Sequence, residues 1–350
     1  MIVIPPIDIT DAMLTSSSAY EAAPAAYNSG TTYSINAYVS VAGSLGQITV
    51  YRSLQNSNLN HTPASSPSWW ENHCNTYNVY NGSTNYLVDE YAIDTTTHKI
   101  YRSLVHPNSG NAQTNTDFWE FIGTTNRWAM FDTDRSAGTV QAAPIVAVLT
   151  PGQRVNSLAL TGLIGSYVTV SMTVSAVSVF SRTISITGRQ TLTWSDYFFG
   201  DFEQVESVLI TDLPPYSNGV ITVTISGTGV VQCSSLVIGL VVNIGKVIYG
   251  ARNDALNFSR IERDDFGNSV LVPRRTVPKT NQTILFNKNQ TNTLIGIRKL
   301  LNAKPAVWSG VDDENSDYFE SLLIIGIYKQ FEIELTHPSH GMLNLELEEL

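Results

Sequence analysis

The sequence predicts a mainly β protein with two small β repeats, a jelly-roll-type β-sandwich and a C-terminal α+β domain. Charged residues make up only 14% of the 350 residues, while Ser, Thr, Val, Ile and Tyr are plentiful, which is typical of strands joined by polar turns. One pattern of aromatic residues occurs twice between residues 27 and 119. Alternating apolar segments then follow one another between residues 145 and 248. A chain of this length with 43% hydrophobic residues can bury several cores.

The pattern divides the chain into five parts. These are an extended N-terminal arm (1–26), a first repeat (27–76), a second repeat (77–126), the sandwich (127–250) and a C-terminal domain (251–350). The arm carries Ile2, Val3 and Ile4, which are poorly suited to free solvent. We therefore expect it to dock on another domain or on a neighbouring subunit, the alternative being a free tail. It has no basic region followed by an apolar one, so no secretory signal is expected.

The repeat is defined by aromatic positions at nearly constant offsets. Tyr27, Tyr33 and Tyr38 recur 53 residues later as Tyr80, Tyr86 and Tyr91. The tetrad Tyr51–Leu54 recurs 50 residues later as Tyr101–Leu104, and Trp69-Trp70 recurs 49 residues later as Phe118-Trp119. The change from 53 to 50 indicates a three-residue deletion at a hairpin. Each copy is expected to form at most three strands, with aromatic rings supplying much of its core.

This order of residues resembles the small chitin-binding modules of carbohydrate-binding families 5 and 12. The resemblance implies a β fold and a sugar ligand, because a flat aromatic face stacks on the C–H face of a sugar ring. The candidate glycan- or partner-binding residues are Tyr33, Trp69, Trp70, Tyr86 and Trp119.

The alternative is that the rings form the small cores, above all the inner tyrosines Tyr38, Tyr51, Tyr91 and Tyr101. Trp69 and Trp70 are adjacent in the chain, and adjacent residues of a strand point to opposite faces. One of these two rings should therefore point inward and the other outward.

The segment from Ile145 to Ile248 predicts six or more strands. The expected strands are 155–163, 167–174, 179–186, 208–210, 220–225 and 236–242, separated by turn residues such as those at 150–152 and 217–219. Strands of this number and spacing are typical of a jelly-roll-type sandwich.

The last hundred residues predict a mixture of helix and strand. A charged hairpin is expected around Phe266-Gly267-Asn268. One helix is expected near 291–302, with an apolar face made by Leu294, Ile297, Leu300 and Leu301. Further strands are expected at 307–310, 321–328, 331–335 and 342–347.

The same region is similar to virion proteins of tailed bacteriophages. The similarity is carried by Asp265–Asn268, Val272-Pro273-Arg274, Trp308-Ser309-Gly310, Gly326–Phe331, Leu345–Glu348 and, further back, Arg127–Asp132. It implies a tail-tip, baseplate or fibre-attachment component that docks to other tail proteins and forms a homo-oligomer within the tail. Such a protein is assembled in the bacterial cytoplasm and located in the virion.

Charge and composition argue against several other partners. The net charge of −10 disfavours nucleic acid, because phosphate binding draws on clustered Lys and Arg. No apolar run reaches the roughly 18 residues that a spanning helix needs, so no membrane insertion is expected. Cys74 and Cys233 are far apart in the sequence, so we expect no disulfide framework, although a bridge between them is an alternative.

No catalytic fingerprint is visible, so we expect no catalytic residues, no metal and no cofactor. Three sets of side chains are the alternatives to this absence of catalytic and metal sites. Asp196, Asp201, Glu203 and Glu206 offer carboxylates for glycoside hydrolysis. Asp312–Asp317 offers oxygen ligands for Ca²⁺ or is a solvated acidic loop. His337 and His340 are read as exposed turn residues. The prediction is a structural virion protein, with a host glycan-binding receptor protein and a polysaccharide-degrading enzyme as alternatives.

Overall fold

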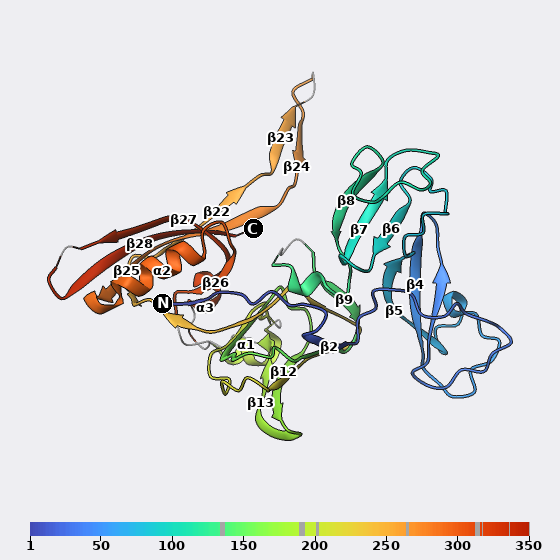
Figure 1. The fold of residues 1–350 in the computed structure, drawn as a ribbon, viewed down its shortest axis with the longest axis horizontal. Helices are drawn as coiled ribbons and strands as arrows, with labels where there is room; N and C mark the ends of the chain where they lie inside the picture. The colour runs from blue at the N-terminus through green and yellow to red at the C-terminus, as the bar shows by residue number, and fades with distance from the viewer. Residues whose placement is uncertain are drawn as a thin grey trace.

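The computed structural model describes residues 1–133, 137–188, 193–200, 203–263, 266–311, 316, 318–335 and 337–349. Strands account for 48% of the chain and helices for 8%, which confirms that the protein is mainly β. Figure 1 shows the two repeats at one side of the molecule and the C-terminal sheet at the other, with the residues of the predicted sandwich between them.

The central region is sandwich-like. A five-stranded sheet has the order β13-β12-β17-β10-β2, with β2 Leu14–Ser17, β10 Ile145–Leu149, β12 Tyr167–Val174, β13 Val177–Ser185 and β17 Val220–Ser226. A three-stranded sheet has the order β16-β11-β19, with β11 Ser157–Thr161, β16 Val208–Ile210 and β19 Ser235–Gly239. Two two-stranded sheets pair β9 Thr139–Ala142 with β18 Val230–Cys233, and β14 Thr187–Gly188 with β15 Glu203–Gln204. One buried cluster joins Val168 and Val223 of the larger sheet to Leu158 and Ile238 of the smaller sheet.

The three-stranded sheet is buried on both of its faces. Leu158 and Leu160 belong to the sandwich core, whereas Ala159 between them belongs to a second cluster with Ile4 and Val307 of the C-terminal sheet. Successive side chains of a strand point to opposite faces, so a strand apolar at every position fits a middle layer. The sandwich and the C-terminal sheet therefore share this layer.

The C-terminal sheet has eight strands in the order β20-β1-β26-β27-β28-β25-β21, with β22 also paired to β25. Its strands are β1 Ile2–Ile4, β20 Val242–Asn243, β21 Lys246–Val247, β22 Arg252–Asn257, β25 Thr276–Asn287, β26 Ala306–Ser309, β27 Leu323–Glu334 and β28 His340–Glu349. Helix α2 (Thr291–Leu300) covers one face, where Leu294 and Ile297 pack with Trp308 and Phe331.

The predicted C-terminal domain, 251–350, does not contain all the strands of this sheet. Strands β1, β20 and β21 all come from before Gly250, and β1 lies between β20 and β26. The N-terminal arm also supplies β2 to the sandwich sheet, where it pairs with β10. Its alternating side chains explain the placement, because Ile2 and Ile4 face one core and Val3 faces the other. Hence the arm docks within its own chain and ties the two regions together.

The helix prediction needs one correction. Leu294, Ile297 and Leu301 are buried, but Leu300 is 54% exposed. At 100° per residue, position 300 lies about 60° to 120° from the other three on the helix surface. The structure also contains helices α1 (Trp194–Phe199) and α3 (Phe319–Leu322) and short 3-10 turns at Pro63–Ser65, Ala129–Phe131 and Lys288–Gln290. Segments this short show no helical periodicity in sequence.

Each repeat copy forms one three-stranded antiparallel sheet. The first has the order β3-β4-β5, with β3 Tyr38–Ala42, β4 Gln47–Ser53 and β5 Trp70–Tyr77. The second has the order β6-β7-β8, with β6 Tyr91–Asp94, β7 Lys99–Ser103 and β8 Trp119–Thr124. Both hairpins have four-residue turns, so the extra residues of the first copy lengthen its strands.

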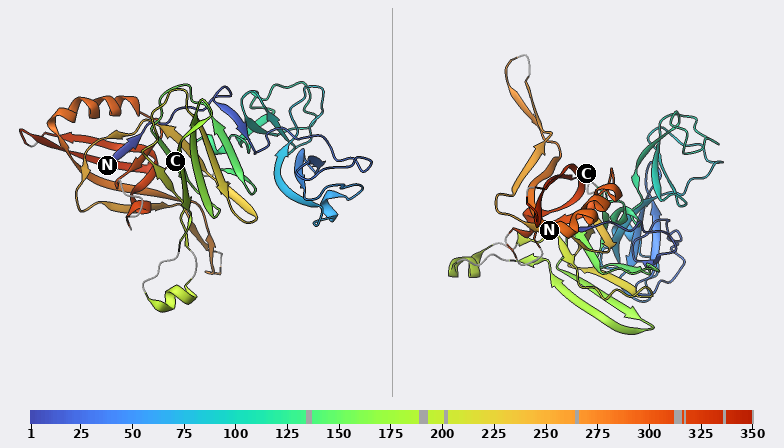
Figure 2. Two further views of the ribbon diagram at one scale, coloured as in Figure 1. Left: turned by 90° about the horizontal axis from the view of Figure 1, so that it is seen from below. Right: turned by 60° about the vertical axis from the view of Figure 1, so that its left-hand side comes forward.

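Two elements project from the body. Strands β23 (Arg260–Arg263) and β24 (Ser269–Val272) form a two-stranded ribbon beyond β22 and β25. Helix α1 extends away from the sandwich in another direction, as both views of Figure 2 show.

Candidate functional site in the aromatic repeats

The aromatic residues of each repeat form the same three-ring cluster. In the second copy, Tyr80 stacks on Tyr86 with ring centroids 5.8 Å apart, and Trp119 meets both rings edge to face at 5.7 and 5.0 Å. In the first copy, Tyr27 stacks on Tyr33 at 6.0 Å, and Trp70 meets them at 6.0 and 5.2 Å. Such edge-to-face geometry is favourable for aromatic rings. The repeated sequence therefore encodes one repeated core.

A polar network fixes each cluster in place. The hydroxyl oxygen of Tyr86 accepts a hydrogen bond from Asn81 N at 2.7 Å, as that of Tyr33 does from Asn28 N at 2.8 Å. The indole nitrogen of Trp119 donates to Asn111 O at 3.0 Å. The side-chain oxygens of Asn28 and Asn81 accept from Gly30 N at 2.8 Å and from Ser83 N at 2.9 Å, which gives the Asn of each Tyr-Asn pair its role.

Asn58 and Asn108 are structural residues that the sequence reasoning missed. The amide nitrogen of each donates to the hydroxyl of the tetrad serine, Ser53 or Ser103, at 3.0 Å, and all four side chains are buried. The two asparagines are 50 residues apart, the offset of the tetrads. That shared offset is the signal by which they could have been found.

The tetrad arginines have a surface role. Arg52 pairs with Glu71 at 2.5 Å, and Arg102 pairs with Glu120 on the equivalent neighbouring strand. These cross-strand pairs are partly exposed, so solvent screens both of them. They hold the edge of each sheet but do not build its core.

Three of the five predicted binding residues lie in the cores. Trp70, Tyr86 and Trp119 are each 2% exposed, so their rings present no face to a ligand in this structure. The buried area of these rings stabilises the repeats, which have few aliphatic side chains to bury. Tyr33 is half-buried, and one of its faces is covered by Tyr27.

Trp69, like Tyr33, is a predicted residue whose ring is partly accessible. It is half-buried, while Trp70 next to it is buried, which is the alternation expected of neighbours at the start of a strand. Its ring stacks on His61 with centroids 3.9 Å apart and planes inclined by 12°. In the second copy these positions hold Phe118 and Asn111. Thus the two copies share a core and differ at this surface.

The inner tyrosines fall between core and surface. Tyr101 is 8% exposed, whereas Tyr38, Tyr51 and Tyr91 are half-buried. Tyr91 stacks on Tyr77 of the first repeat at 4.9 Å, so it belongs to the junction between the copies.

The hairpin turn of the first repeat makes that junction. Tyr91 N donates to Leu45 O at 3.0 Å, and Asn78 N donates to Gly46 O at 3.0 Å. The longer hairpin of the first copy carries this turn to the second copy, which gives the three-residue difference a structural reason. A Cβ on Gly46, whose φ is +77°, would lie 2.2 Å from Tyr91 O.

Gly46→Ala is expected to loosen this junction. Gly110→Ala is the matched control, because Gly110 has a similar φ of +74° but no atom within 4 Å of its Cβ position. Both variants incur about 1 kcal/mol of backbone strain, and only Gly46→Ala must also displace a carbonyl. Limited proteolysis should cut Gly46→Ala between the repeats several times faster than Gly110→Ala. Equal cutting rates would show that the contact does not restrain the two copies.

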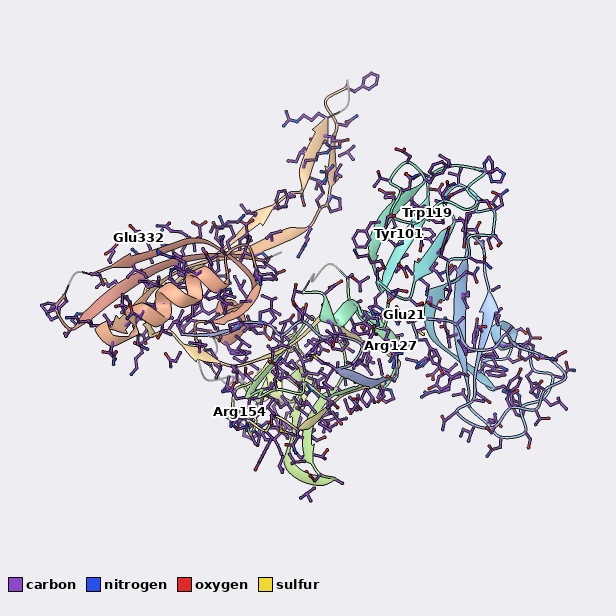
Figure 3. The ribbon with its side chains drawn as sticks, in the orientation of Figure 1. Glu21, Tyr101, Trp119, Arg127, Arg154 and Glu332 are labelled. Carbon is purple, nitrogen blue, oxygen red and sulfur yellow. The ribbon has the colours of Figure 1, made fainter. Side chains whose placement is uncertain are left out.

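The equivalent turn of the second repeat joins the central region through Glu21. His98 Nδ1 lies 2.9 Å from Glu21 Oε1, Thr125 Oγ1 donates to the same oxygen at 3.0 Å, and Trp128 Nε1 donates to Oε2 at 3.3 Å. The His98 ring also stacks on Trp128 at 4.0 Å. Figure 3 shows Glu21 where the second repeat meets the central region. The first repeat also meets the central region directly, because β5 packs against β9 and His73 Nε2 lies 3.4 Å from Ser18 O of the arm.

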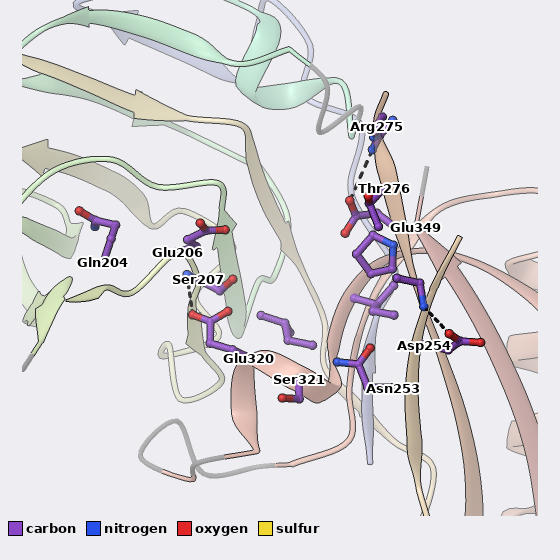
Figure 4. A pocket seen from close by; sticks show the side chains of 14 residues that line it. Gln204, Glu206, Ser207, Asn253, Asp254, Arg275, Thr276, Glu320, Ser321 and Glu349 are labelled. Atoms are coloured by element: carbon purple, nitrogen blue, oxygen red, sulfur yellow. Dashed lines mark hydrogen bonds and ion pairs between the residues drawn. The ribbon is translucent and has the colours of Figure 1, made fainter. Parts of the chain in front are cut away.

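The carboxylates considered for glycoside hydrolysis are only partly described. Asp201 and the side chains of Asp196 and Glu203 lie outside the described part of the structure. Glu206 lines a cavity of about 600 Å³ with Glu320 and Glu349 (Figure 4). Glu320 Oε1 accepts from Ser207 N at 3.0 Å, and Glu349 Oε1 lies 3.4 Å from Arg275 Nη2. Glu320 thus has a structural partner across the boundary between the sandwich and the C-terminal sheet, whereas Glu349 is paired within the C-terminal part.

The remaining candidate positions are the acidic segment 312–317 and the two histidines His337 and His340. Five of the six residues of the acidic segment 312–317 lie outside the described residues, and so does the Ca²⁺ alternative placed on them. His337 is exposed, and its ring stacks on His340 at 4.1 Å, with Ser339 Oγ 2.9 and 3.1 Å from their Nδ1 atoms. Among the described residues, no group of three or more His, Cys, Asp or Glu side chains is placed to hold a metal ion.

Both cysteines are buried and free. Burial raises the pKa of the Cys74 thiol to about 11 and that of the Cys233 thiol to about 12. A thiol with a raised pKa is a poor nucleophile at neutral pH, because the thiolate is the reactive form. The two side chains are consequently small core residues.

No protein-family model matches this sequence, and no curated protein or solved structure matches the chain. The described part of the chain also contains no helix with the length and apolarity that a bilayer crossing requires.

Proposed function

We propose that this chain is a structural component of a bacteriophage tail, located at the tail tip, the baseplate or a fibre-attachment point. It docks to other virion proteins, is assembled in the bacterial cytoplasm and has no enzymatic role. The proposal includes the jelly-roll topology of residues 127–250 and an α+β assembly domain over residues 251–350.

The observation that supports this role is that the N-terminal arm contacts every other part of the chain. The arm places β1 in the C-terminal sheet, β2 in the sandwich sheet and Glu21 at the second repeat. The hairpin turn of each repeat then contacts the next part of the chain. A protein built this way holds two small modules in fixed positions beside a large body, which suits a scaffold that displays contact modules.

Immunogold labelling tests the location. Particles of the phage that encodes this chain should bind an antibody to it at the tail. If the antibody bound free protein in the lysate but left the tails unlabelled, that result would contradict the proposal.

Trp69 and His61 favour a second candidate function, binding of a host-surface glycan. An accessible indole beside a polar imidazole offers one stacking face and one hydrogen-bonding group, and the second repeat lacks this pair. Trp69→Ala should abolish binding on a glycan array, while Phe118→Ala, its counterpart, should leave binding unchanged. Equal binding by wild type and Trp69→Ala would exclude this ring as the platform.

A further inference from the structure

His73 lies buried where the first repeat meets the N-terminal arm. It belongs to β5, and its side chain is enclosed, with the residue only 2% exposed. The ring packs edge to face against Tyr38 of the same repeat, with centroids 4.9 Å apart, and against Tyr20 of the arm at 6.0 Å. Its Nε2 atom lies 3.4 Å from Ser18 O of the arm. The imidazole is therefore enclosed between the first repeat and the arm.

The arm segment that covers this ring is itself held by the sandwich. Ser18 N donates to Val146 O at 2.9 Å, and Ser18 Oγ accepts from Val146 N at 2.8 Å. Further along β5, Thr76 Oγ1 donates to Glu21 O of the arm, and β5 also packs against β9. His73 thus lies in the contact that holds the first repeat on the arm and on the sandwich.

This environment suits a neutral imidazole. A carbonyl oxygen can only accept a hydrogen bond, so Nε2 of His73 carries the hydrogen that points to Ser18 O. The other ring nitrogen, Nδ1, is then unprotonated, and it is buried with no hydrogen-bond partner among the described residues. Protonation would give Nδ1 a hydrogen that has no acceptor and would bury a positive charge, and both changes cost free energy.

The nearest charged groups do not offset this cost. Burial is the main reason that the pKa of His73 lies below its ordinary value. The hydrogen bond to Ser18 O raises the pKa, the Arg52 guanidinium lowers it and the Glu71 carboxylate raises it. The last two effects oppose each other, because Arg52 and Glu71 form an ion pair at 2.5 Å.

The other ionisable groups at this contact are uncharged or are bound elsewhere. Tyr20 and Tyr38 face His73 with their aromatic rings. Burial raises the pKa of the Tyr20 hydroxyl and raises that of the Cys74 thiol to about 11, so neither group is an anion at neutral pH. The carboxylate of Glu21 is bound at the junction with the second repeat. Strands β9 and β10 contain no ionisable side chain.

We propose that protonation of His73 in mildly acidic solution detaches the first repeat from the arm and the sandwich. In the detached state the imidazole is hydrated and takes up a proton in the ordinary range, whereas in the docked state the charge is disfavoured by burial. The detached state therefore binds the proton more tightly, and the contact loses stability as the pH falls below about 6.5. Above that pH both states hold a neutral ring, so the contribution of this contact is fully present.

Detachment at His73 leaves the two repeats joined to each other. Their junction consists of the hydrogen bond from Tyr91 N to Leu45 O and the stacking of Tyr91 on Tyr77, and His73 takes part in neither contact. Acid thus frees the first repeat from the body while it stays on the second repeat. The device acts at an internal contact, so it does not depend on the proposed place of the protein in a tail.

Cys74 is a native reporter of this contact. Its thiol is buried beside the backbone of Tyr20, so detachment of the arm exposes it, while Cys233 in the sandwich core stays buried unless the sandwich unfolds. The reaction of each thiol with dithiodipyridine is followed on the full-length chain between about pH 5 and about pH 7.5, the range in which histidine titrates. Dividing by the rate of the same thiol in the denatured chain at the same pH gives a protection factor.

The protection of Cys74 in the wild type should fall several-fold from neutral to acidic pH, and by no more than about tenfold per pH unit, because one proton is taken up. His73→Phe keeps an aromatic ring against Tyr20 and Tyr38 but cannot be protonated, so its protection should not change with pH. His340→Phe, on β28 of the C-terminal sheet, is the matched control and should behave as the wild type does. Cys233 should stay protected in all three proteins.

Three results would overturn the proposal. Constant protection of Cys74 in the wild type would exclude a pH-dependent contact. A fall in protection that persists in His73→Phe would assign the effect to another group, such as His98. Exposure of Cys74 and Cys233 together in acid would show unfolding of the chain and not detachment. If thermal unfolding shows that His73→Phe is not folded, His73→Gln provides the same test, because its amide can donate to Ser18 O and does not titrate.

Discussion

Replacing Trp119 with alanine is expected to destabilise the second repeat by about 3–5 kcal/mol. The side chain is 2% exposed, contacts Tyr80 and Tyr86, and donates a hydrogen bond to Asn111 O. Its removal leaves a cavity in a module that has little other apolar area to bury. Hydrogen exchange of the full chain should show amides of β7 and β8 opening at least about 100-fold more often, since 1.4 kcal/mol is a factor of ten.

Trp69→Ala is the matched control for that prediction. Trp69 is half-buried and stacks on His61 at the edge of the first repeat. Its loss should cost about 1–2 kcal/mol, because only part of the ring area is removed from water on folding. If Trp119→Ala left exchange in β8 unchanged, the ring would not be part of the core, and its role as a binding residue would have to be considered again.

Glu21→Ala is expected to detach the second repeat from the central region. Three groups lose their acceptor together, namely His98, Thr125 and the indole nitrogen of Trp128. A buried donor without a partner costs roughly 1–3 kcal/mol, so the junction should weaken by about 2–5 kcal/mol. Small-angle X-ray scattering should show a larger maximum dimension, because the second repeat is then free to move relative to the sandwich, while the first repeat keeps the packing of β5 on β9.

Asp11→Ala separates this effect from a general loss of charge near His98. Asp11 Oδ1 lies 3.3 Å from His98 Nε2, but its side chain is 74% exposed, so solvent screens the pair. Asp11→Ala should have the same maximum dimension as wild type. The maximum dimension of Glu21→Gln should lie between those of wild type and Glu21→Ala, because glutamine keeps one acceptor oxygen at nearly the same position. A compact Glu21→Ala protein would show that the stacking of His98 on Trp128 holds the junction by itself.

Much of the repeat could be predicted from its spacing alone. Nearly constant offsets of Tyr, Asn and Trp indicate equivalent positions in two copies of one fold, so three strands and an aromatic core follow from local pattern. The strand over residues 167–174 was predicted with its observed ends, since its strict alternation matches a half-buried strand. The three-residue difference between the copies was located at the correct hairpin, but its purpose depends on the contact of Gly46 with Tyr91.

The placement of the aromatic rings could not be predicted in the same way. Aromatic rings are suited both to a sugar-stacking platform and to the core of a small module. The sequence therefore does not distinguish these two roles for Trp70, Tyr86 and Trp119. Only the burial of each ring separates the two interpretations.

The sequence by itself determined the local units: the β character of the chain, the two repeated modules and the helix at 291–300. Hydrophobic periodicity and turn residues act over a few neighbouring positions, so the elements they encode can be recognised without knowledge of the tertiary contacts. The tertiary structure alone decided that Ile2–Ile4 enters the C-terminal sheet, that β11 lies in a layer covered on both faces, and that Glu21 joins the arm to the second repeat. Each of these depends on residues far apart in the chain meeting in space, and no local pattern records which distant surface a strand will cover.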